Sequence, residues 1–228
     1  GDWSSDVCSS DLVQAWRELC LDSARAEAET LTREIETGTI RGPLHGIPIG
    51  VKDIIDVKGV PTRCNSLSRA DIGPATADAE TVTALRAAGA IVLGKTHTTE
   101  FAFRDPSPAC NPYNLAHTPG GSSSGSGAAV GAGMVPVALG TQTMASVNRP
   151  AAYCGAFGFK PTYNRVPLTG IKPLSVSFDT LGMMARHVDD IALLDAALSG
   201  ADPSEPPAVP QDRKSTRLNS SHQIISYA

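Results

Sequence analysis

The chain has 228 residues, of which 41% are apolar and 18% are charged, and its formal net charge at pH 7 is −4. A chain of this length can bury a substantial hydrophobic core. The mildly acidic balance argues against a nucleic-acid partner, because proteins that bind polyanions usually carry a basic stripe. The sequence has no run of about 18 apolar residues, so we expect no membrane-spanning segment.

Cysteine usage indicates the expected compartment. The cysteines are odd in number, lie far apart and form no Cys-x-x-Cys pair: Cys8, Cys20, Cys64, Cys110 and Cys154. This pattern argues against a structural zinc site and against a disulfide framework. No secretory signal pattern opens the chain, and we therefore expect a reduced, cytoplasmic protein.

The two ends differ in composition from the rest of the chain. Residues 1–12 are rich in Ser and Asp, and residues 212–228 are basic and rich in Ser and Asn. Both resemble translated sequencing-adapter read-through, although a pair of disordered tails would have the same composition. We therefore expect two non-native tails around a native segment at residues 13–211.

The first half of that segment predicts an α/β sheet. Apolar positions at helical spacing predict an amphipathic helix over residues 13–37. Gly and Pro then separate two short β-rich runs at residues 47–51 and 54–57. A second helix is expected at residues 79–88, and the continuous apolar run at residues 90–94 is typical of a strand buried on both faces. Strand, helix and buried strand in this order predict an α/β fold.

The second half predicts a long loop followed by buried elements. Residues 105–127 are rich in Pro, Gly and Ser and are expected to form a loop. The small apolar residues 128–139 predict a buried helix followed by a strand, and residues 157–160 begin another buried piece. The last expected helix covers residues 188–198 and ends at Gly200.

Lys52 is the first candidate for chemistry, because it directly follows the apolar run 47–51. Burial of a lysine lowers its pKa, and a neutral amine can act as a base. The alternative is a lysine at a strand end whose amine reaches water.

Two further segments are weaker signals when each is taken alone. The Gly/Ser run 120–127 fits either a flexible linker or an anion-binding nest, and it lacks the Gly-Lys-Ser/Thr ending of a P-loop. Ser146 lies in residues 140–150 without a Gly-x-Ser-x-Gly elbow. None of the histidines is placed to suggest a Ser-His-Asp set: His45, His97, His117, His187 and His222.

Together, in this order and spacing, the motifs resemble the amidase signature family. The matching pieces are GPLHGIPIGVKD, GGSSSGSGAAV, GMVPVALGTQT, RPAAYCGAFGFKPTYNRVP and FDTLGMMARHVDDIALL. The resemblance implies a mixed, mostly parallel central sheet flanked by helices. Family members are about twice as long, so it also implies that this chain holds the first half of that fold. A half-sheet leaves an unpaired edge, and we expect residues 13–211 alone to be poorly stable.

The resemblance implies a Ser–cisSer–Lys triad. Lys52 matches the general base, Ser122 the bridging serine and Ser146 the nucleophile. A cis peptide bond would join Gly121 to Ser122. Ser146 would attack an amide carbonyl and form an acyl-enzyme that water then hydrolyses.

The backbone N–H groups of Thr143, Met144, Ala145 and Ser146 would form the oxyanion hole, and neither a metal nor an organic cofactor is implied. Met144 and Ala145 depart from the family, which usually has two glycines, or a small residue and a glycine, before the nucleophile. If position 145 needs a positive φ, alanine there costs about 1–2 kcal/mol. Asn148 also departs from the usual aliphatic residue or arginine.

The implied function is hydrolysis of a linear carboxylic amide, a small molecule, to an acid plus ammonia or an amine. One alternative is the A subunit of a glutamine-dependent aminoacyl-tRNA amidotransferase, and another is an inactive truncated fragment. Gln142 and Arg149 match a branch of stand-alone amidases, which favours the first function. The resemblance leaves room for a homodimer of the full-length protein.

Overall fold

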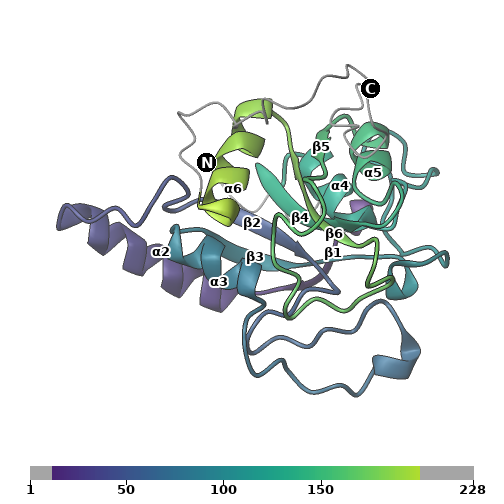
Figure 1. Cartoon of the computed structure of the whole chain (residues 1–228), viewed down its shortest axis with the longest axis horizontal. Helices are drawn as coiled ribbons and strands as arrows, with labels where there is room; N and C mark the ends of the chain where they lie inside the picture. The colour runs from purple at the N-terminus through teal and green to yellow at the C-terminus, as the bar shows by residue number, and fades with distance from the viewer. Residues whose placement is uncertain (1–11, 201–228) are drawn as a thin grey trace, which may run out of the picture.

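The structure is a computed structural model that describes residues 12–200. Its centre is a six-stranded sheet with helices on both faces (Figure 1). The expected tails at 1–12 and 212–228 lie outside the described residues except for Leu12, as do residues 201–211 at the end of the expected native segment. The boundaries of that segment therefore stay a prediction.

The sheet is mixed, with parallel strands at its centre. In spatial order its strands are β1 (Trp16–Leu19), β3 (Ile91–Thr96), β2 (Pro48–Lys52), β4 (Val137–Gln142), β6 (Thr180–Ala185) and β5 (Phe157–Phe159). Strand β2 is parallel to both of its neighbours, β3 and β4. The outer pairs are antiparallel. The expected α/β class with a mixed central sheet is confirmed.

The helices divide between the two faces of this sheet. They are α2 (Leu21–Glu36), α3 (Glu80–Ala87), α4 (Ser124–Gly131), α5 (Asn148–Tyr153) and α6 (Val188–Ser199), with short 3-10 turns η1 (Leu67–Arg69) and η2 (Glu100–Ala102). Helices α3 and α6 share one apolar cluster, and α4 and α5 share another. The predicted helices at 79–88 and 188–198 and the predicted strand at 90–94 are confirmed, and Gly200 ends α6 with a φ of 69°.

The prediction of one helix over residues 13–37 is wrong at its beginning. Residues 16–19 form strand β1, which pairs with β3, and the helix begins only at Leu21. Burial alternates along β1, as it does in a strand with one covered face. The free edge of β3 thus decides the structure of these residues, although their apolar spacing also suits a helix.

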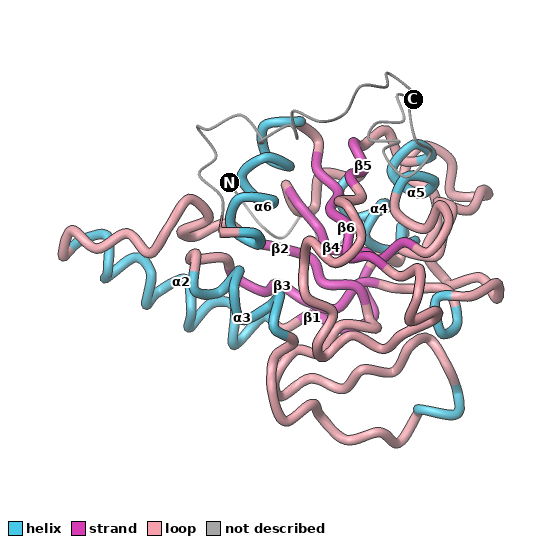
Figure 2. The backbone as a smooth tube through the Cα atoms, viewed as in Figure 1, coloured by secondary structure: helices cyan, strands magenta, loops and turns pink. Residues whose placement is uncertain are grey.

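The predicted strand at residues 54–57 is also wrong. The backbone N–H groups of Ile54 and Ile55 both turn back to the Lys52 carbonyl, at 2.8 and 3.0 Å, so the chain leaves the sheet there. Figure 2 shows the connection from β2 to α3 as a long loop interrupted by η1. Farther on, α4 begins at Ser124, inside the segment predicted to be loop.

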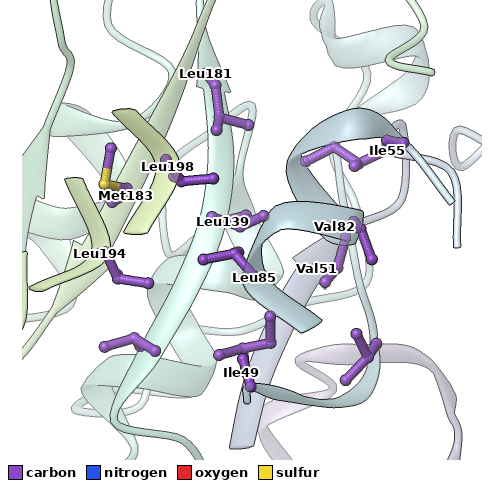
Figure 3. Packing of buried hydrophobic residues seen from close by; sticks show 14 of the residues in the cluster. Ile49, Val51, Ile55, Val82, Leu85, Leu139, Leu181, Met183, Leu194 and Leu198 are labelled. Carbon is purple, nitrogen blue, oxygen red and sulfur yellow. The ribbon is translucent and has the colours of Figure 1, made fainter. Parts of the chain in front are cut away.

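The core depends on alternation along β4 and β6. Leu139 and Met183 face the α3–α6 side and pack with Leu85 and Leu194 (Figure 3). Their neighbours Ala138 and Met184 belong to the cluster on the opposite face, which includes the alanines of α4. The small residues of α4 let its backbone approach the sheet closely.

Gly125 is the position where that close approach is most sensitive. A Cβ there would lie 2.2 Å from the Ala15 carbonyl oxygen and 2.3 Å from the His97 nitrogen, so the backbone would have to shift. We expect Gly125→Ala to lower the free energy of unfolding by about 3 kcal/mol, measured by urea unfolding. At Gly73 a Cβ meets nothing within 4 Å, so the control Gly73→Ala should change stability by less than about 0.5 kcal/mol. Equal stability of the two variants would contradict the packing described.

Candidate active site

The candidate site lies where β2 and β4 end. Lys52 is the last residue of β2, and Gln142 is the last residue of β4. Because these strands are parallel and adjacent, their carboxyl ends meet at one edge of the sheet, where α/β proteins commonly bind ligands. Ser122 reaches the same edge from the segment that leads into α4.

The Lys52 amine is completely buried and contacts two hydroxyl groups. Its Nζ lies 2.8 Å from Ser122 Oγ and 2.9 Å from Thr141 Oγ1. Burial lowers the pKa of Lys52 to about 7, against the opposing charges of Asp179 and Cys64. The alternative in which this lysine reaches water is therefore wrong.

The Gly/Ser segment is built into the core. Residues 122–124 are buried, and the peptide bond between Gly121 and Ser122 is cis. The Ser122 carbonyl accepts a hydrogen bond from the Thr99 N–H at 3.0 Å. The Ser123 Oγ accepts from the Thr141 N–H at 3.2 Å. The interpretation of this run as a flexible linker is wrong, because each of these contacts fixes its backbone.

Ser146 lies in the turn between β4 and α5 and is half-buried. Its carbonyl accepts a hydrogen bond from the Ser123 N–H at 3.1 Å, which holds this turn against the Gly/Ser segment. The Gln142 Oε1 holds the turn from the other side, accepting from the N–H groups of Val147 at 2.8 Å and Asn148 at 3.0 Å. Lys52 is thus hydrogen-bonded directly to Ser122. Ser146 is held next to Ser122 by a backbone hydrogen bond to Ser123.

Residues 143–146 form the turn that ends at Ser146. Among the described residues, the N–H groups of these four residues have no acceptor in the protein. The Thr143 hydroxyl donates to Asp179 Oδ1, and the Met144 side chain is 86% exposed. Ala145 does not have a positive φ, so the strain considered for an alanine at this position does not arise.

A pocket of about 720 Å³ opens beside this turn. It is lined by Gln142, Thr143, Met144, Ala145, Asn148, Arg149, Ala152, Tyr153, Lys160, Tyr163, Ser177, Phe178 and Thr180. Two of these residues, Arg149 and Lys160, are cationic, and none of the lining residues is acidic. The pocket is therefore positive in a chain whose formal net charge is −4.

Sequence reasoning missed two polar residues of the site, Thr141 and Asp179. Thr141 lies in a mostly apolar strand, so the sequence did not single it out. The pairing of Val51 with Leu139 places Thr141 next to the end of β2, where Lys52 lies. Asp179 stands 33 residues beyond Ser146 in sequence, since 179 − 146 = 33, and only the pairing of β4 with β6 brings it back. The available signal in the sequence was an aspartate directly before the apolar run that forms β6.

Residues 12–200 contain neither a metal-binding cluster of side chains nor a helix suited to span a membrane. Within this range no cluster of three or more His, Cys, Asp or Glu side chains is placed to hold a metal ion. None of the helices in the same range combines the length and apolar character needed to cross a membrane.

These features define an α/β protein with a buried lysine–serine pair near a pocket that two cationic residues line. The chain belongs to the Amidase family, whose model matches residues 9–225. It is 43% identical over 199 residues to the A subunit of the glutamyl-tRNA(Gln) amidotransferase of Halalkalibacterium halodurans, covering 85% of this chain and 41% of that protein.

Two other relatives carry different names. AtzE, a 1-carboxybiuret hydrolase subunit of Pseudomonas sp., is 39% identical over 201 residues, covering 86% of this chain and 44% of that protein. The peptide amidase structure of Stenotrophomonas maltophilia is 41% identical with a TM-score of 0.77, covering 86% of this chain and 43% of that one. The chain spans about two fifths of the length of the curated relatives it matches.

Burial of Lys52 should make stability depend on pH. The folded state holds the pKa of this amine at about 7, whereas the ordinary value is 10.5. Between these values the unfolded chain binds the proton more strongly, so stability is lost as pH falls from 10.5 to about 7 and stays constant below. We expect Lys52→Met to be more stable than the parent at pH 7 by on the order of 2–4 kcal/mol.

This advantage of Lys52→Met should shrink steadily toward pH 10, because the parent loses its penalty there. Urea unfolding at a series of pH values measures the difference. Lys58 is exposed, so Lys58→Met serves as the control and should show no such trend. A gap between Lys52→Met and the parent that stayed constant from pH 7 to pH 10 would contradict a depressed pKa.

Proposed function

We propose that this chain carries the catalytic residues of an amidase that hydrolyses a linear carboxylic amide to an acid plus ammonia or an amine. The observation that carries the proposal is the buried contact of 2.8 Å between Lys52 Nζ and Ser122 Oγ. With its pKa at about 7, this amine is neutral in a large share of molecules at neutral pH and can accept a proton. Membership of the Amidase family supports the same reaction.

The proposed proton path runs from Ser146 through Ser122 to Lys52. The neutral amine has one lone pair for the Ser122 proton, and one of its N–H groups donates to Thr141. Ser122 in turn takes the proton of Ser146, whose oxygen attacks the amide carbonyl. The leaving amine receives the proton back along this path, and water then hydrolyses the seryl ester.

The turn before Ser146 suits the proposed oxyanion hole. Four successive N–H groups, at Thr143, Met144, Ala145 and Ser146, lack an acceptor within the described protein. Three of these residues line the pocket. Because the Gln142 side chain already accepts from the next two N–H groups, the four remaining donors are left for the charge that develops on the attacked oxygen.

The charge of the pocket favours one class of amide. Arg149 and Lys160 line it, and none of its lining residues is acidic. We therefore infer that the amide carries a carboxylate that these cations bind, since guanidinium and ammonium groups form charge-assisted hydrogen bonds with carboxylates.

A second candidate function is the A subunit of a glutamine-dependent amidotransferase. The identity of 43% to a relative of that name favours it, and glutamine is itself an amide with a carboxylate. Release of ammonia from glutamine would use the same three side chains. Glutamine dependence and a copurifying partner would separate this function from that of a stand-alone amidase.

Labelling of Ser146 tests the proposed path. We expect a fluorophosphonate probe to modify Ser146 at pH 8, and Ser146→Ala to abolish the modification, as peptide mass spectrometry would detect. Lys52→Ala and Ser122→Ala should slow labelling by about 10²-fold or more, because each breaks the path of the proton. Ser177 lines the pocket beside the turn that holds Ser146, so Ser177→Ala is a control and should label like the parent. Complete absence of labelling in the parent would favour an inert fragment.

Protection from that label tests the substrate class. We compare a short amide that ends in a carboxylate with the same amide that ends in a methyl group. We expect the carboxylate form to halve the labelling rate of Ser146 at about one tenth of the concentration that the methyl form needs. Arg149→Ala should remove most of this preference, whereas Lys172→Ala, outside the pocket, should keep it. Equal protection by the two amides would argue against carboxylate recognition.

A further inference from the structure

Asp179 is a buried carboxylate that the proposed proton path does not use. It is 7% exposed and directly precedes β6, in the FDTLG segment. The adjacent pairing of Gln142 with Thr180 places it next to the end of β4. A buried carboxylate is costly unless hydrogen bonds compensate it, so the groups around this one indicate why it is there.

Both oxygens of Asp179 accept hydrogen bonds from donors of different segments. Oδ1 accepts from the Thr143 hydroxyl, in the proposed oxyanion turn. Oδ2 accepts from the backbone N–H groups of Leu174 at 2.7 Å and Ser175 at 2.9 Å. Within residues 12–200 it forms no ion pair with a lysine or arginine. Its negative charge is therefore not cancelled by a contacting cation.

The buried amine of Lys52 lies near that charge, because its partner Thr141 lines one cavity together with Asp179 and Lys172. Lys52 likewise forms no ion pair within the described chain, and Asp179 is the larger of the two charges that favour its protonated form. The other is Cys64, whose own pKa burial raises to about 11, so this thiol is uncharged near neutral pH. Asp53 follows Lys52 in the chain but pairs with Lys95 at 2.9 Å.

We infer that Asp179 is a positioning residue for amide hydrolysis, which anchors the oxyanion turn through Thr143 and supplies the negative charge that acts on the Lys52 amine. This inference rests on the proposed function. The two roles require one carboxylate at the junction of β4 and β6, because Thr143 follows β4 and Asp179 precedes β6. A residue with only one of these roles would either anchor the turn or act on the amine, but not both.

The charge is tested on Lys52 itself, without any need for activity. In the full chain with isotope-labelled lysine, the side-chain NMR signal of Lys52 is assigned by its loss in Lys52→Met and followed against pH. We expect Asp179→Asn to lower the titration midpoint by about one unit, because it removes an opposite charge while keeping the shape. Asp195→Asn makes the same change in net charge at the Arg165 ion pair and should leave the midpoint within about 0.2 unit. An equal effect of the two substitutions, or none from Asp179→Asn, would overturn the inference.

The anchor is tested at Thr143, which leaves the carboxylate in place. We expect Thr143→Val to slow fluorophosphonate labelling of Ser146 about tenfold and to leave the Lys52 midpoint within about 0.3 unit. Thr143→Ser, which keeps the hydroxyl, should restore labelling. Labelling of Thr143→Val at the parental rate would overturn the inference even where Asp179→Asn fails to fold. A shifted Lys52 midpoint in a chain whose Ser146 never labels would refute only the proposed function.

Discussion

The arrangement of the candidate site depends on one constraint: the Lys52 amine is buried, and no residue in the described range 12–200 forms an ion pair with it. Burial without an opposite charge in contact favours the neutral form of this amine, and hydroxyl groups can hydrogen-bond that form. Ser122 and Thr141 provide them from two other segments. The β2–β4 pairing and the entry into α4 therefore have to be in place before Lys52 can have this environment.

Small residues make that environment available. The serines between Gly121 and α4 face the end of β4, and a Cβ on Gly140 would lie 2.7 Å from the Ser123 Oγ. Ser126, within α4, donates to the Leu139 carbonyl at 2.8 Å. Larger side chains on either element would separate helix from sheet and admit water to the amine. The Gly/Ser composition is thus a packing requirement of the site.

The sequence predicted those parts of the fold that local pattern determines. The apolar run of β3 and the final helix with Gly200 are examples, because each has a signal contained in its own residues. Strand β1 could not be predicted, since the edge of β3 decides its structure. Asp179 could not be predicted for a similar reason: its partner Thr143 is 36 residues away in sequence, and only tertiary structure brings the two together.

A second buried lysine, Lys95, shows how a contacting carboxylate changes the state of a buried amine. Lys95 is as fully buried as Lys52 and also follows an apolar run, so local sequence does not distinguish the two. Lys95 donates to Asp53 at 2.9 Å and to Thr62 at 3.1 Å, which compensates its charge within the core. Among the described residues, the hydrogen-bond partners of the Lys52 amine are the hydroxyl groups of Ser122 and Thr141. Equal burial thus yields a compensated ion pair at Lys95 and an amine with a lowered pKa at Lys52, because a carboxylate contacts only Lys95.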